Sequence, residues 1–117
     1  EFGSKTEYGK WNSLMQNSLE GGLTWLEYFY SVTRNPWRSQ FHEYYYYLYS
    51  LERVAMFSGM RYIGEHNWYY EGSCPLLGLQ QDDGKWGEGV VETSFALLFL
   101  KKGTVPLRSR VVTGENG

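Results

Sequence analysis

The sequence predicts an all-α protein made of antiparallel α-hairpin repeats, with about five helices in all. Apolar residues recur in successive segments at the three- and four-residue spacing that is typical of amphipathic helices. Related residues also recur about 50 positions apart, which is the length of a helix-loop-helix repeat. With 117 residues, the chain is long enough for one small domain of this kind.

Two helices are predicted before the first proline, over residues 5–16 and 19–32. The first has an apolar stripe formed by Tyr8, Trp11, Leu14 and Met15. The second has a stripe formed by Leu19, Leu23, Leu26 and Tyr30. Gly21 and Gly22 weaken the second helix by about 1 kcal/mol each relative to alanine, and Pro36 follows its end.

The third helix is predicted over residues 40–58, with Ser39 as its N-cap and Gly59 at its end. Its apolar stripe is Phe41, Tyr44, Tyr45, Leu48, Leu51 and Ala55. Three further tyrosines lie on its other sides: Tyr46, Tyr47 and Tyr49. The helix is thus aromatic nearly all round, which predicts burial on more than one side. A run of tyrosines also suits a strand, but the pattern continues to Val54 without a turn signal and therefore favours a helix.

Asn67 is the predicted N-cap of a fourth helix over residues 68–80. Pro75 falls inside this helix, where it removes one backbone hydrogen bond at a cost of about 3 kcal/mol. The alternative is a later start, with Ser73 as the cap and Pro75 in the first turn. A fifth helix is predicted over residues 91–102, because Phe95, Leu98 and Phe99 share one face. Its two terminal lysines suit the negative end of the helix dipole.

Two recurrences indicate that these helices are repeats. One set recurs 51 positions later, where Gly72 and Leu76-Leu77 match Gly21 and Trp25-Leu26. Another recurs 49 positions later, where Leu97 and Leu100 match Leu48 and Leu51. The repeat region then spans residues 1–103, and its first helix is the second half of a truncated hairpin. Residues 104–117 are expected to form an extended or disordered tail.

The composition narrows the function classes. Lys and Arg number 11 against 13 Asp and Glu, so the basic surface that nucleic acids require is not expected. No apolar run approaches the roughly 20 residues of a membrane-spanning helix. The single cysteine excludes an internal disulfide and a cysteine-based zinc cluster. No cofactor is expected.

Five features of the second repeat have a fixed spacing: Gly72, Leu76-Leu77, Gln80, Gly84 and Trp86. They resemble the glutamine-tryptophan repeat of the squalene and hopene cyclases, and residues 94–100 resemble an inner helix of such a repeat. Residues 46–53 and 63–69 further resemble bacterial prenyltransferase-like and squalene-cyclase-like repeat proteins. The cyclases and the β subunits of protein prenyltransferases are α/α toroids. The resemblance, over about residues 21–103, therefore implies a partial α/α toroid.

The residues of this motif are expected to have structural roles. Gln80 ends an outer helix, where its amide can bridge that end and the start of the next helix. Gly84 permits a tight turn. Trp86 offers a flat face to the glutamine and packs against the neighbouring repeat. The corresponding loop of the first repeat keeps only a tryptophan, Trp37.

No catalytic residue and no metal ligand is predicted. The cyclases protonate their substrate with an Asp-x-Asp-Asp motif, which this sequence lacks. Asp82 and Asp83 lie in a polar loop, where aspartate is a common turn residue. The prenyltransferases bind zinc through Asp, Cys and His. The soft ligands of this chain are Cys74, His42 and His66. Cys74 is expected to be a small buried or half-buried apolar residue, and His42 is expected to lie at the surface.

The tyrosines of the third helix are the candidate ligand-facing residues: Tyr45, Tyr46 and Tyr49. Inner helices of a toroid line its cavity, where aromatic faces can hold an isoprenoid chain or stabilise a cation. The alternative, which we favour, is that these tyrosines pack between repeats with their hydroxyls at the edge. Aromatic faces also stack on sugars, so they do not select isoprenoids by themselves.

The size of the chain favours a binding role over catalysis. A closed toroid takes five to seven hairpins by resemblance, whereas this chain supplies about two and a half, and a short stack leaves apolar faces exposed. The rest of a longer chain, or self-association, is expected to cover them. We therefore predict a non-catalytic repeat module that acts as a scaffold or interaction surface. The alternative is part of an isoprenoid cyclase or prenyltransferase whose aromatic-lined cavity binds a polyprenyl substrate. A carbohydrate-active α/α barrel is a weaker third hypothesis, because no pair of carboxylates is placed for it.

Overall fold

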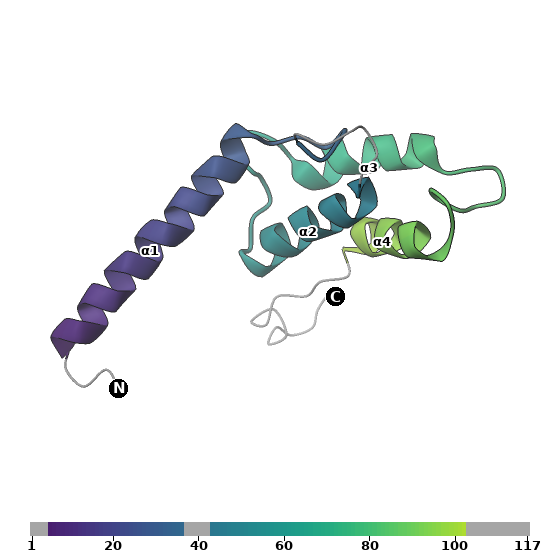
Figure 1. Cartoon of the computed structure of the whole chain (residues 1–117). Helices are drawn as coiled ribbons and strands as arrows, with labels where there is room; N and C mark the ends of the chain where they lie inside the picture. The colour runs from purple at the N-terminus through teal and green to yellow at the C-terminus, as the bar shows by residue number, and fades with distance from the viewer. Residues whose placement is uncertain (1–4, 37–42, 103–117) are drawn as a thin grey trace, which may run out of the picture. The chain divides into compact units, whose positions relative to one another are not determined.

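The computed structural model describes residues 5–36 and 43–102, and its regular secondary structure is helical (Figure 1). The four helices are α1 (Lys5–Tyr28), α2 (Tyr44–Phe57), α3 (Trp68–Leu79) and α4 (Val90–Lys101). Within the described ranges there is no strand, only an isolated bridge between Ile63 and His66. The all-α prediction is confirmed for this part of the chain. The chain divides into two compact units, and the boundary along the sequence lies between Tyr30 and Ser31. The first unit contains α1, and the second contains α2 to α4.

α1 is a single helix where the sequence predicts two, over residues 5–16 and 19–32, so this prediction is wrong. Gly21 and Gly22 lie inside it, and a Cβ at either would meet no atom within 4 Å. A glycine keeps its backbone N–H, so it weakens the hydrogen-bonded helix by about 1 kcal/mol without ending it. The helix also ends at Tyr28, before the predicted end at residue 32.

α2 confirms that the tyrosine run is helical and not a strand. Its buried face consists of Tyr44, Tyr45, Leu48, Leu51, Glu52 and Ala55, which includes most of the predicted stripe. The helix ends at Phe57, one residue before the predicted end and two before Gly59. The helix begins at Tyr44, and Glu43 has a left-handed backbone with a φ of 52°, so the prediction that residue 43 is helical is wrong. Residues 40–42 of the predicted helix, and its predicted cap Ser39, lie outside the described residues.

α3 begins at Trp68, so the earlier of its two predicted starts is correct. The side chain of Asn67 accepts a hydrogen bond from the backbone N–H of Tyr70 at 3.1 Å, as an N-cap does. Pro75 lies inside the helix. Burial of Trp68 and Leu76 in the core offsets the hydrogen bond that the proline removes.

The core of the second unit forms where α2 packs mainly against α4, and α3 covers both. α3 and α4 run in opposite directions and are joined by the loop over residues 80–89 (Figure 1). The Phe99 ring of α4 meets the Trp68 ring of α3 edge to face, with centroids 5.7 Å apart. The Trp68 indole in turn donates to the Met60 carbonyl at 2.8 Å. This buried contact joins the start of α3 to the last turns of α4, at the end of the hairpin opposite to the loop. The predicted tail, residues 104–117, lies outside the described residues.

Candidate functional site

The loop between α3 and α4 is held by hydrogen bonds from the predicted motif residues. Gln80 ends α3, and its Nε2 donates to the Gly84 carbonyl at 2.8 Å. Gly84 has a φ of 99°, a left-handed conformation that favours glycine. The Gln80 amide therefore closes the loop on itself, whereas the sequence predicted a link between the ends of two helices.

Trp86 makes the link between α3 and α4. Its side chain is buried, and its indole N–H donates to the Leu76 carbonyl in the last turn of α3 at 2.7 Å. Its backbone N–H donates to the Thr93 hydroxyl in α4 at 2.9 Å. The neighbouring Gln81, which the sequence analysis did not single out, donates from Nε2 to the Gly87 carbonyl at 2.8 Å. These bonds fix the loop where it approaches the first turn of α4.

The three candidate ligand-facing tyrosines of α2 have different surroundings. Tyr45 is buried, Tyr46 is 54% exposed and Tyr49 is half-buried. Tyr46 and Tyr49 both contact Phe95 of α4, with ring centroids 5.4 Å and 5.1 Å apart. The Tyr49 hydroxyl also accepts a hydrogen bond from Nη1 of Arg53 at 3.0 Å. Tyr46 and Tyr49 thus both contact α4 through Phe95, and the packing of these tyrosines between repeats stays a prediction.

Two other tyrosines anchor the segment that precedes α2. The hydroxyl of Tyr44 donates to the Val32 carbonyl, and that of Tyr47 donates to the Ser31 carbonyl at 2.7 Å. Burial, followed by the neighbouring tyrosines Tyr45 and Tyr47, raises the pKa of Tyr44 to about 12. Burial also raises the pKa of Tyr47, although its bond to Ser31 acts in the opposite direction. Both phenols are therefore neutral donors at physiological pH.

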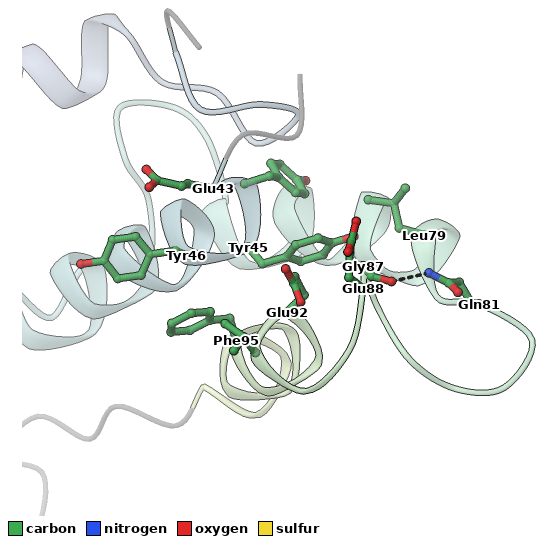
Figure 2. Close-up of a pocket in the computed structure, with 11 residues that line it drawn as sticks. Glu43, Tyr45, Tyr46, Leu79, Gln81, Gly87, Glu88, Glu92 and Phe95 are labelled. Carbon is green, nitrogen blue, oxygen red and sulfur yellow. Dashed lines mark hydrogen bonds between the residues drawn. The ribbon is translucent and has the colours of Figure 1, made fainter. Parts of the chain in front are cut away.

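A pocket of about 570 Å³ lies where the first turns of α2 and α4 meet the α3–α4 loop (Figure 2). Its lining combines aromatic rings with carboxylates: Tyr45, Tyr46, Phe95, Glu43, Glu88 and Glu92. The sequence analysis singled out Tyr45 and Tyr46 but missed Phe95 and the glutamates. Glu88, Glu92 and Phe95 are spaced four and three residues apart in the sequence. This helical spacing is the signal that could have placed them on the same side of the predicted fifth helix and the residues before it.

Glu92 is positioned by the loop. Gly87 has a φ of 61°, and a Cβ on it would lie 2.6 Å from Cγ of Glu92. The side chain of Glu92 therefore rests against a backbone that has no side chain of its own. Burial, followed by the negative charge of Glu92, raises the pKa of Tyr45. The pocket thus places a half-buried carboxylate beside a neutral phenol.

The remaining candidate ligands do not form a site. Among residues 5–36 and 43–102, no group of three or more His, Cys, Asp or Glu residues could hold a metal ion. His66 lies 3.0 Å from Glu71, Nδ1 to Oε1. Cys74 is exposed on α3, so the prediction that it is buried or half-buried is wrong. Asp83 accepts a hydrogen bond from the backbone N–H of Lys85 at 3.2 Å, as expected of a turn residue. His42 lies outside the described residues.

The outer side of α4 is an exposed apolar surface. It carries one stripe at helical spacing, the α4 stripe: Val90, Val91, Ser94, Leu97, Leu98 and Lys101. Val90 is 82% exposed and Leu97 is 49% exposed. In the part of the chain that the structure describes, no helix is both long and apolar enough to cross a membrane. The apolar side chains of this stripe are typical of a protein-binding surface.

Comparisons with protein-family models, with curated proteins and with solved structures give no match. The resemblance to the cyclase repeats therefore stays a prediction from the motif residues. The pocket and the α4 stripe are interpreted from their own geometry.

Proposed function

We propose that residues 31–102 form a non-catalytic helical interaction module that pairs with a second copy of the chain through the α4 stripe. The observation that carries this proposal is the exposure of Leu97 and Leu98 at the centre of the stripe. Together with Val90 and Val91, they form an apolar face, interrupted by Ser94, on a helix about 18 Å long. Exposure of such a face to water is unfavourable, so the protein is stabilised when another apolar face covers it.

The repeat register supports this proposal. An offset of 49 positions aligns Leu97 with Leu48 and Leu98 with Tyr49. Leu48 is 1% exposed, and Tyr49 packs against Phe95 of α4. The face of α2 that matches the α4 stripe is thus covered, whereas the α4 stripe is exposed among the described residues. Under the repeat hypothesis, the stripe corresponds to a surface between helices.

Charge supports an antiparallel pairing of two copies. The stripe has Lys101 at its C-terminal end, and the exposed Glu88 precedes its N-terminal end. Two antiparallel copies of α4 place each Lys101 near the Glu88 of its partner, whereas a parallel pair brings like charges together. The same patch on both subunits gives a two-fold symmetric dimer. Because one short helix buries less than the roughly 1,200 Å² of a stable interface, the dimer is expected to be weak.

Sedimentation equilibrium of the whole chain, at concentrations up to roughly 1 mM, tests the proposal. The Leu97→Glu variant places a carboxylate in the apolar face and is expected to weaken association at least about tenfold. The control is Leu77→Glu on α3, because Leu77 is exposed too, at 65% against 49% for Leu97, but lies outside the stripe and should leave association unchanged. A chain that stays monomeric, or equal effects of both variants, would contradict the proposal.

A charge exchange tests the orientation. Lys101→Glu alone is expected to weaken the dimer by roughly threefold, since it brings two negative charges together. Adding Glu88→Lys to this variant restores the complementary pair and should recover the association. Failure of the double variant to recover it would exclude the antiparallel arrangement.

The alternative function, binding of a polyprenyl substrate, has less support. The pocket lined by Tyr45 and Tyr46 is also lined by three glutamates, whose negative charge repels the diphosphate group of such substrates. Tyr49, the third candidate aromatic, is not among the pocket's described lining residues.

A further inference from the structure

The pocket between α2 and α4 has the chemistry of a cation site. Its described lining residues include three glutamates and no lysine, arginine or histidine. Glu43 and Glu88 are exposed at its edge, whereas Glu92 is half-buried inside. Carboxylates that line a concave surface make its electrostatic potential more negative, and such a surface attracts a positively charged ligand.

Glu92 is held in place within this pocket. Its stem packs against Gly87, and the carbonyl of Gly87 is fixed by Nε2 of Gln81 at 2.8 Å. Burial, followed by the negative charge of Glu92, raises the pKa of Tyr45, as a carboxylate beside the phenol does. Figure 2 shows the Glu92 carboxylate beside the Tyr45 ring. The charged group therefore has a defined position, which an exposed surface glutamate lacks.

Aromatic rings form the other wall of the pocket. The rings of Tyr46 and Phe95 lie 5.4 Å apart at an angle of 57°, and the Tyr45 ring lies on the other side of Glu92 (Figure 2). The faces of such rings carry partial negative charge and attract cations. A hydrocarbon would gain nothing from the glutamates, and a metal ion would gain little from the rings. A cation covered by methyl groups interacts favourably with both.

We propose that this pocket binds the trimethylammonium group of a small organic cation. Such a group has no N–H to donate, so it does not need the ordered acceptors that a primary ammonium requires. Its charge is satisfied by Glu92 and its methyl groups by the rings of Tyr45, Tyr46 and Phe95. The pocket volume of about 570 Å³ lies within the range of small-molecule sites.

Choline and its uncharged isostere 3,3-dimethyl-1-butanol test the proposal on the whole chain. The two molecules have nearly the same shape and differ in the charge. We expect choline to shift the NMR amide signals of Gly87 and Phe95 in a saturable way, and the isostere to leave them unchanged. Equal shifts with both would overturn the proposal. So would no saturable shift at roughly 10 mM choline, which is tenfold above a Kd of 1 mM.

Variants identify the groups involved. Glu92→Gln keeps the shape of the side chain and is expected to weaken choline binding roughly three- to tenfold. Glu65→Gln makes the same change of charge in the α2–α3 connection, outside the pocket, and should have no effect. Equal losses in both variants would mean that only the net charge matters and would overturn the proposal.

A second pair of variants tests the rings. Phe95→Leu removes an aromatic face but keeps an apolar side chain, so it is expected to weaken choline binding about threefold. Phe57→Leu removes an exposed ring outside the pocket and is the control. An affinity unchanged by Phe95→Leu, with the fold intact by circular dichroism, would contradict the role of the rings.

The trimethylammonium group occurs both in free molecules and in lipid headgroups. Co-sedimentation with phosphatidylcholine vesicles separates these sources. Choline binding without co-sedimentation supports a free cation as the ligand. Co-sedimentation that free choline competes away supports a headgroup bound through the same pocket.

Discussion

Gly72 of α3 lies directly against the Phe99 ring of α4, where a Cβ would be 2.5 Å from Cζ of the phenylalanine. The ring is fully buried and has little room to move, because Trp68 meets it edge to face and Tyr69 stacks on it with centroids 5.9 Å apart. The two helices of the hairpin can approach this closely because residue 72 has no side chain.

Gly72→Ala is therefore expected to lower the free energy of unfolding by about 1–3 kcal/mol, the cost of overpacking a core. Urea unfolding followed by circular dichroism measures this change. Gly78→Ala, in the same helix, is the control, because a Cβ there meets no atom within 4 Å. It should leave stability unchanged or raise it by up to about 1 kcal/mol. A stable Gly72→Ala protein would show that the helices can separate without cost.

Trp86→Phe tests the link between α3 and α4. The variant keeps an aromatic ring but leaves the carbonyl of the buried Leu76 without the indole donor, at an expected cost of about 1–3 kcal/mol. The same measurement on Trp25→Phe, whose indole is partly exposed on α1, should show a change within about 0.5 kcal/mol. Similar values for both variants would mean that the Leu76 bond contributes little.

The raised pKa of the buried Tyr44 phenol is expected to lower the free energy of unfolding at alkaline pH. Its pKa is about 12 in the folded chain against about 10 in an unfolded one, so the folded state holds the phenol proton more tightly. This contribution is fully present below pH 10 and is lost as the pH rises through 12. Urea midpoints between pH 8 and pH 12 should fall less steeply for Tyr44→Phe than for the parent chain. Tyr46→Phe, which removes an exposed hydroxyl, should keep the parent slope.

The start of α3 and the C-terminal ends of α2, α3 and α4 lie within one residue of their predicted positions, because their signals are local. Asn67 caps α3 through a bond to the third residue after it, so its role depends only on nearby residues. Gly59 and Gly84 mark chain reversals for the same reason. The split of α1 between residues 16 and 19 was wrong, because Asn17 and Ser18 keep their backbone N–H groups and continue the helix in place of capping a new one.

The candidate site was predicted only in part. Tyr45 and Tyr46 stood out because they belong to a run of tyrosines on one helix. Glu92 is equally important to the pocket, but its role depends on how α4 approaches α2 and on the missing side chain of Gly87. The first of these relationships joins segments more than 40 positions apart, and the second depends on how the loop folds back on α4. No local spacing in the sequence specifies them.

Cys74, the single cysteine of the chain, is exposed on α3. A thiol-specific probe would therefore attach at one defined point, away from the pocket lining and from the α4 stripe. Spin labels at this point would measure the separation of two associated subunits without altering the surfaces that are proposed to bind.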